Sequence, residues 1–269
     1  MNAGQKLPRI VMIGAGNVAS SLAPAIKQAG AGKIVQVYSR TPDHARDLAA
    51  RLEDAAAISR PEDIDTGADI CLVSVADDAV AKIVAAVKPG NALWLHTSGS
   101  VPMSVLAPAS PRHGVFYPLQ TFSRDVAVDL STVSLFTEGS DPSTEAEIGD
   151  LARKVFSNVF HADSATRRVM HVAAVFACNF VNYMWVVAHD LLQRENLPMD
   201  VLFPLLTETL RKAVTASPDM GQTGPAVRGD SAVMNRHLDM LDGDNREIYR
   251  LVSEAIMNRF NVSHEPDRL

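Results

Sequence analysis

A glycine-rich stretch near the start of the chain constrains its fold more than any other feature. The apolar run Arg9-Ile-Val-Met-Ile13 ends in Gly14-Ala-Gly16-Asn17-Val18-Ala19, and a helix-like pattern follows. This order predicts a strand, a tight turn and a helix. Gly14 permits the sharp turn, Gly16 lets a pyrophosphate approach without meeting a Cβ, and small Ala19 lets the helix pack on the strand. The first-turn N–H groups, those of Asn17 and Val18 included, would face the phosphates; the alternative is a glycine-rich turn without a ligand.

The end of the second predicted strand, Lys33 to Tyr38, carries Ser39-Arg40-Thr41. NAD-binding folds place an acidic residue about 20 residues after the glycines, where it binds the ribose 2′-hydroxyl. Two hydroxyls and a guanidinium stand there instead, and these groups suit a 2′-phosphate. We therefore predict NADP rather than NAD; the alternative is a solvated turn whose Arg40 points to water.

The remaining patterning predicts an α/β protein with two domains. Near-continuous apolar runs at 69–75 and 92–96 are typical of parallel strands buried on both faces. From Ser164 onward only helical patterns follow. We predict a doubly wound parallel sheet over residues 1–163 and an all-helical domain over 164–269.

Composition narrows the class of protein. A net charge of −6 without a Lys/Arg run argues against a nucleic-acid surface. The two cysteines, Cys71 and Cys178, are expected to be buried free thiols in a reducing compartment, and their spacing does not suggest a metal. The first eight residues lack the pattern of a signal peptide, so we expect a cytoplasmic protein.

The run Val169 to Ala188 is long and apolar enough to imitate a membrane span. It contains His171, Asn179 and Asn182, and nothing else in the chain resembles a second span. We therefore expect no membrane insertion and interpret the run as the buried central helix of a domain or a dimer.

Polar residues follow the predicted parallel strands at the edge where such folds bind ligands. Val75 ends one strand and Ala76 follows it; both would bind the cofactor, and Asp77 or Asp78 is expected to cap the next helix. His96-Thr97-Ser98-Gly99-Ser100 follows another. Thr97 and Ser98 would bind the cofactor and Ser100 the substrate, unless the segment is only a turn that caps a helix.

Further along, Gly114 to Phe122 is expected to be a strand that breaks at Pro118. Tyr117 and Gln120 would line a substrate cleft or pack a turn. Ser143 is the expected cap of a helix over 143–156.

Several of these segments together resemble one superfamily. The segments are the glycine turn, Ser39-Arg40-Thr41, His96 to Ser100, Tyr117-Pro-Leu-Gln-Thr-Phe122 and Thr223-Gly-Pro-Ala-Val-Arg-Gly-Asp230. The chain resembles pyrroline-5-carboxylate reductases, 6-phosphogluconate-type dehydrogenases and deazaflavin-dependent NADP reductases. Within them it is most similar to a branch that joins a Rossmann-like domain to a helical domain of unknown function. The resemblance implies NADP and a homodimer formed through the helical domain, often intertwined, and names no substrate.

The candidate proton donors differ from those of that superfamily. Its hydroxyacid-type members carry a lysine and an asparagine four residues apart on the long helix, where this chain has His171 and Val175. We choose His171, because imidazole changes charge near neutral pH; a core histidine is the alternative. His96 competes for this role.

Two further polar residues are second candidates. Asn179, about 12 Å from His171 along an ideal helix, would orient a polar group or bond to another helix. At about 100° per residue, His171, Asn182 and His189 would lie near one line. Arg228 would meet an anion, either a substrate carboxylate or a phosphate, and Asp230 would cap the helix that carries His237.

We therefore expect an NADP-dependent oxidoreductase that transfers a hydride between NADPH and a small, carboxylate-bearing carbonyl or imine substrate. A non-catalytic dinucleotide-binding regulator or scaffold is the main alternative. A methyltransferase that uses S-adenosylmethionine is a third, which Ser39-Arg40 disfavours because such folds usually place an acidic residue there.

Overall fold

The computed structural model describes residues 6–260 except 125 and 127. Residues 1–5, part of the segment expected to lack a signal peptide, thus lie outside the described residues. The chain forms two compact units, residues 1–179 and 180–269. The first is an α/β unit and the second is helical, so the expected fold class is confirmed.

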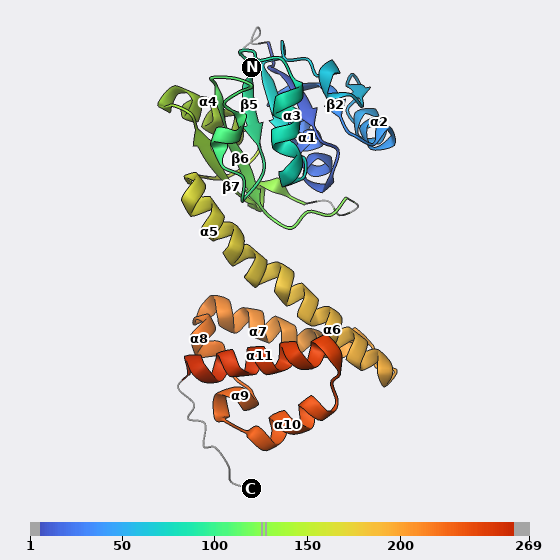
Figure 1. The fold of residues 1–269 in the computed structure, drawn as a ribbon, viewed down its shortest axis with the longest axis vertical. Coiled ribbons are helices and arrows are strands. Elements are labelled where there is room, and N and C mark those ends of the chain that lie inside the picture. The colour runs from blue at the N-terminus through green and yellow to red at the C-terminus, as the bar shows by residue number, and fades with distance from the viewer. Residues whose placement is uncertain (1–5, 125, 127, 261–269) are drawn as a thin grey trace. The chain divides into compact units, whose positions relative to one another are not determined.

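One eight-stranded sheet forms the centre of the first unit (Figure 1). Its strand order is β3-β2-β1-β4-β5-β6-β7-β8, and β1 to β6 run parallel. β7 is antiparallel to β6 and parallel to β8. The order reverses between β1 and β4, which is where doubly wound sheets bind their ligands. The strands are β1 (Arg9–Ile13), β2 (Lys33–Tyr38), β3 (Ala56–Ile58), β4 (Ile70–Val73), β5 (Leu93–His96), β6 (His113–Leu119), β7 (Ser134–Gly139) and β8 (Asn158–His161).

Helices cover both faces of this sheet. Ile10 and Met12 of β1 belong to the core on one face, with apolar residues of α1 (Asn17–Gln28), α2 (Pro42–Ala50) and α4 (Pro142–Arg153). Val11 and Ile13 belong to the core on the other face, with α3 (Asp77–Ala86). Burial on both faces is why the central strands are apolar at successive positions. Short 3₁₀ turns lie at η1 (Pro61–Asp63), η2 (Met103–Leu106) and η3 (Leu130–Thr132).

The chain is helical after β8, as predicted. α5 (Ser164–Ala174) passes through a π-helical segment, η4 (Val175–Phe180), into α6 (Val181–Arg194). There follow η5 (Met199–Leu202), α7 (Phe203–Thr215), α8 (Pro218–Gly221), α9 (Pro225–Arg228), α10 (Ser231–Asp239) and α11 (Gly243–Arg259). The boundary expected near Asp163 marks the change from strands to helices. The compact units divide later, after Asn179, because α5 bonds to the sheet unit.

Three local expectations differ from the structure. Pro118 does not break its strand: beyond Val115, β6 pairs only with β7, and a proline is tolerated where one side of a strand has no partner. Asp141, not Ser143, caps α4, accepting from Ser143 N and Thr144 N at 2.9 and 3.0 Å. No side chain caps α3.

The long apolar helix also differs from the expectation of a buried helix. Cys178 is exposed, although Cys71 is buried as predicted, and Val169 is 70% exposed. In the described part of the chain, Ser164–Arg194 is the one helix whose length and composition would suit a membrane span, a test that core helices of soluble proteins also pass. The π-helical segment interrupts the 3.6-residue period between His171 and Asn182. His171 is therefore shifted out of the line that Asn182 and His189 share on α6.

Candidate functional site

The turn between β1 and α1 forms a cradle for an anion. Gly14 has a φ of +122° and donates from its N–H to Tyr38 O at 2.8 Å. A Cβ on Gly14 would lie 2.1 Å from Ser74 O, whereas a Cβ on Gly16 would meet nothing within 4 Å. Gly16 stands at the N-cap of α1 without a side-chain cap, and no acidic residue lies in the first turn. The first-turn N–H groups, which have no partner within the helix, are thus available to a phosphate.

A cavity of about 570 Å³ extends from this cradle along the ends of β1, β2 and β4. Its lining includes Gly14 and Gly16, and also Ser39, Arg40 and Thr41 as predicted. Ser39 Oγ accepts from Thr41 N at 3.2 Å, which shapes the turn. His44 and Lys82 add two basic side chains, while Asp78 adds a carboxylate. This donor set suits a 2′-phosphate.

A second cavity of about 430 Å³ shares Gly16, Ser74, Val75 and Ala76 with the first. It continues along the end of β5, along the edge of β6 that has no partner strand beyond Val115, and onto α5. We call this cavity the substrate cleft. The predicted site residues that line it are Gly16, Asn17, Val18, Val75, Ala76, Thr97, Ser98, Tyr117, Gln120, His171 and Asn179.

Tyr117 and His171 meet in the substrate cleft. Tyr117 Oη lies 3.1 Å from His171 Nδ1, and the two rings pack edge to face. The backbone of Gly99 lies directly against the imidazole, since a Cβ there would be 2.6 Å from His171 Nδ1. Burial raises the pKa of Tyr117, Arg167 opposes the rise and Asp77 adds to it. The phenol therefore stays protonated at neutral pH and can donate a hydrogen bond.

A buried ion pair fixes the start of α5 and hence the position of His171 one turn later. Arg167 has no exposed surface; it pairs with Glu138 of β7 and donates to Val101 O at 2.6 Å. Glu138 also accepts from Ser164 N at 3.0 Å. Because an unpaired buried charge is costly, this network holds α5 on the sheet.

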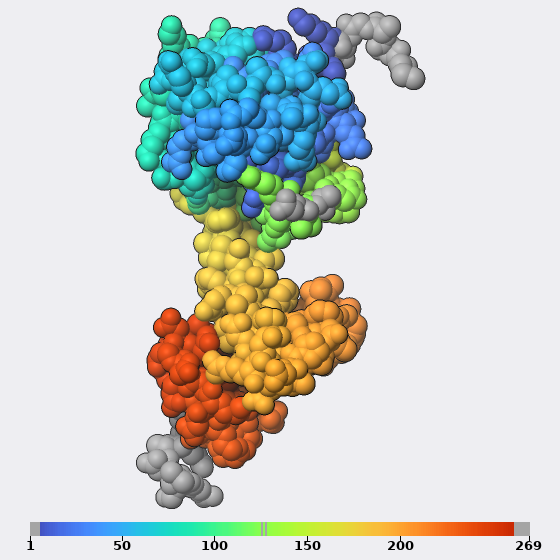
Figure 2. All heavy atoms as spheres, turned by 90° about the vertical axis from the view of Figure 1, so that its right-hand side faces the viewer, coloured from blue at the N-terminus to red at the C-terminus, as the bar shows by residue number. Residues whose placement is uncertain are grey.

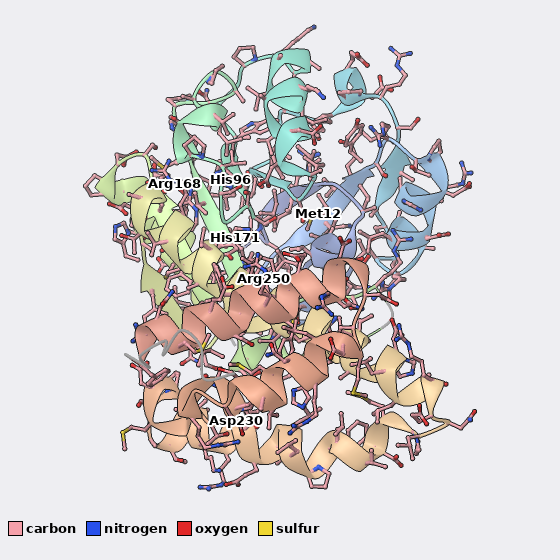
Figure 3. The ribbon with its side chains drawn as sticks, turned by 60° about the horizontal axis from the view of Figure 1, so that its bottom comes forward. Met12, His96, Arg168, His171, Asp230 and Arg250 are labelled. Atoms are coloured by element: carbon pink, nitrogen blue, oxygen red, sulfur yellow. The ribbon has the colours of Figure 1, made fainter. Side chains whose placement is uncertain are left out.

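The structure gives His96 no access to the cleft. His96 is fully buried, and its Nδ1 accepts from Ser98 N at 3.2 Å. Burial, reinforced by the charge of Arg167, lowers the pKa of His96 to about 4. A neutral, enclosed imidazole is a poor proton donor at neutral pH, so the geometry favours His171 (both are labelled in Figure 3).

Three other predicted site residues, Ala19, Ser100 and Arg228, line neither cavity. Ala19 is buried and packs α1 on the sheet, as expected. Ser100 donates its hydroxyl to Asp77. Arg228 is exposed at the end of α9 in the second unit, and Asp230 caps α10 by accepting from Val233 N at 3.1 Å, as predicted. Among the residues that the structure describes, no cluster of three or more potential metal ligands occurs.

Sequence reasoning missed several residues of these cavities. Asp77 lines the cleft, and Lys82 lines the neighbouring cavity. Lys82 could have been predicted to lie near that cavity, because it follows Asp78 by one turn on the same helix. The sequence does not single out Arg167, which stands just before the apolar run that begins at Val169. Its partner is 29 residues earlier in the chain, and no local pattern reports such a pairing.

Comparisons with known proteins agree with this architecture. Residues 9–93 match the family described as NADP oxidoreductase, coenzyme F420-dependent, and residues 133–256 match a domain of unknown function, DUF2520. No curated protein sequence matches the chain.

Solved structures extend the comparison to nearly the whole chain. A protein named "putative NADP oxidoreductase" from Bacteroides fragilis is 41% identical, with a TM-score of 0.86 over 94% of this chain and 98% of that one. A protein from Thermotoga maritima is 19% identical, with a TM-score of 0.72 over 94% and 99% of the two chains. An imine reductase from Myxococcus stipitatus, solved with NADP⁺, is 16% identical, with a TM-score of 0.65 over 94% and 93%. The last two show the shared fold. On the identity and coverage of the first, the chain belongs to the NADP oxidoreductase family that joins a Rossmann-like domain to a DUF2520 domain.

Proposed function

We propose that this protein uses NADPH to reduce a carbon–oxygen or carbon–nitrogen double bond in a small molecule. Membership of an NADP oxidoreductase family gives the cofactor and the class of reaction. The observation that supports a catalytic site is the Tyr117–His171 pair in a cleft that joins the phosphate cradle.

The residues of the two cavities fit the cofactor. The missing Cβ of Gly16 leaves open space beside the α1 N-terminus, and a pyrophosphate would occupy it. Arg40, with Ser39 and Thr41, would hold the 2′-phosphate, while Thr97 and Ser98, which line the cleft, would bond to the carboxamide. When bound there, NADPH supplies a hydride.

The protein itself would supply the proton. When protonated, His171 would donate from Nδ1 to Tyr117 Oη and from its second ring nitrogen to the substrate, and the proton transfer would leave a neutral imidazole. The contact with Gly99 and the Arg167–Glu138 pair keep the ring in place. Gln120 would orient the double bond whose carbon accepts the hydride, and Asn179 would bond to a polar group elsewhere on the substrate. General acid catalysis of this kind contributes about 10²–10⁴-fold to a rate.

We also propose that residues 164–269 serve for dimerisation in a cytoplasmic homodimer. On α7, coloured orange in Figure 2, Leu205, Leu210 and Val214 are 62%, 66% and 76% exposed. Exposed apolar residues grouped on one helix are typical of a protein interface. The apolar character of Ser164–Arg194 has the same explanation.

The proposal is tested by following NADPH oxidation with a panel of small ketones and cyclic imines. We expect turnover by the wild-type protein, and a loss of about 10²-fold or more in His171→Ala with NADPH affinity unchanged within twofold. Tyr117→Phe should lose activity to a smaller degree. Tight binding of NADPH without reduction of any compound would count against the proposal and favour the non-catalytic alternative.

A further inference from the structure

The substrate cleft is lined by one acidic side chain, while the positive charge of Arg167, which also reaches Tyr117, is fully buried and paired with Glu138. Apart from His171, Asp77 is the only residue with an ionisable acidic or basic side chain, cysteine and tyrosine excepted, among those that line the cleft in the described part of the chain. The neighbouring cavity contrasts with it, since Arg40, His44 and Lys82 line that one. Among the described residues of the first unit, no lysine or arginine that could pair with a substrate carboxylate lines the cleft.

The carboxylate of Asp77 is fixed near Tyr117 in the substrate cleft. It is the first residue of α3, where the helix dipole stabilises a negative charge. The hydroxyl of Ser100 donates to one carboxylate oxygen and fixes the side chain. Its charge reaches Tyr117, since Asp77 adds to the rise that burial causes in the pKa of that phenol.

We infer that Asp77 makes this cleft selective for a substrate whose reacting group carries a positive charge, namely a protonated imine. The inference rests on the proposed function and names the substrate class of that site. A carboxylate attracts a nearby cation and repels an anion. Asp77 is exposed in the absence of ligands, so its effect is expected to be largest when the cofactor and substrate exclude water from the cleft.

The chemistry of the two double bonds explains the preference for an imine. The nitrogen of a neutral imine takes a proton from the Tyr117–His171 pair and becomes an iminium ion, which Asp77 stabilises. The hydride then forms a new C–H bond, and the π electron pair of the C=N bond becomes the lone pair of a neutral amine. A ketone instead develops negative charge on oxygen, and Asp77 opposes this charge. A carboxylate on the substrate, which the sequence led us to expect, would be opposed in the same way.

Asp77 has one competing role, which is to hold a hydroxyl of the cofactor. In that case Asp77→Asn would weaken the binding of NADP⁺ and would change the affinities for cationic and neutral ligands equally. The two roles therefore differ in a binding measurement that needs no turnover.

The test uses three five-membered rings that differ in charge, added to the full-length protein saturated with NADP⁺. 2-Methylpyrrolidine is a cation at pH 7.5, 2-methylcyclopentanone is neutral and cyclopentanecarboxylate is an anion. Ligand-observed NMR titration gives each dissociation constant. We expect the cation to bind at least tenfold more tightly than the ketone, about 1.4 kcal/mol, and the anion to bind most weakly.

Matched variants assign the preference to one carboxylate. Asp77→Asn should bring the cation and the ketone within twofold of each other without changing NADP⁺ affinity, and Asp77→Glu should retain the preference. Asp150→Asn removes the same charge from exposed α4, where Asp150 pairs with Arg153, and should change nothing.

Several results would overturn the inference. Equal binding of the cation and the ketone, tightest binding of the anion, or a cation preference that survives Asp77→Asn would each do so while leaving the proposed function intact. Failure of the wild-type protein to bind NADP⁺ would overturn the proposed function and the inference with it.

Discussion

The two glycines of the first turn should respond in opposite ways to the same added methyl group. In Gly14→Ala the new Cβ would lie 2.1 Å from Ser74 O and 2.6 Å from Ser74 C, and the residue would keep a φ of +122°. Backbone strain of about 1–3 kcal/mol adds to overpacking of about 1–3 kcal/mol. We expect the melting temperature to fall by roughly 5–20 °C.

In Gly16→Ala the methyl group meets no protein atom within 4 Å. The free energy of unfolding should stay within about 0.5 kcal/mol of wild type, as for most surface substitutions. The methyl would instead occupy the closest approach of the pyrophosphate to α1. Loss of one charge-assisted hydrogen bond costs about 1.5–3 kcal/mol, which corresponds to about a 10- to 150-fold weaker NADPH affinity.

Thermal unfolding by circular dichroism and a fluorescence titration with NADPH measure the two effects on the same samples. Wild-type NADPH affinity in Gly16→Ala would refute the assignment of the phosphate cradle. Wild-type stability in Gly14→Ala would refute the account of the contact with Ser74.

Three other predictions follow from the site and the second unit. His96 has a folded-state pKa of about 4 against an ordinary value near 6.5, so the stability it contributes is present above pH 6.5 and is lost as the pH falls through 4. This contribution to the free energy of unfolding is about 3 kcal/mol. Denaturant unfolding at a series of pH values should show a weaker dependence of that free energy on pH in His96→Gln than in the wild type. An equal dependence in both proteins would contradict the lowered pKa of His96. Gly99→Ala should displace the imidazole of His171, which NMR of the histidine side chains would detect, whereas Gly149→Ala, whose Cβ meets only the mobile end of Arg153, should leave it in place. If both variants give the wild-type histidine spectrum, Gly99 does not position His171. Leu210→Glu should convert a dimer to a monomer in sedimentation analysis, and a wild-type protein that is already monomeric would refute the proposed interface.

The sequence predicted those parts of the fold that local patterns determine. The glycine turn, the apolar central strands and the acid-free end of β2 each depend on residues that are neighbours in the chain. They were sufficient to predict the doubly wound sheet and the family, and the structure and the comparisons confirm both.

Features set by distant contacts could not be predicted in this way. The pairing of β6 with β7 decides that Pro118 stays in a strand, and the Arg167–Glu138 pair decides where α5 begins on the sheet. The π-helical turn at Val175–Phe180 changes the phase of the long helix. The sequence indicated only a helix cap at Asp77 or Asp78. The bond between Asp77 and Ser100 joins residues 23 apart in the chain, and no local pattern indicates it.

A side-by-side titration with NADPH and NADH, on the wild-type protein and on Arg40→Ala, tests the cofactor assignment most directly. Arg40 lines the cavity beside the phosphate cradle, with Ser39 and Thr41 on the same turn. We expect NADPH to bind at least tenfold more tightly than NADH, about 1.4 kcal/mol, and Arg40→Ala to abolish that difference. Equal affinity for the two nucleotides, or binding of neither, would contradict the assignment of this site to NADP.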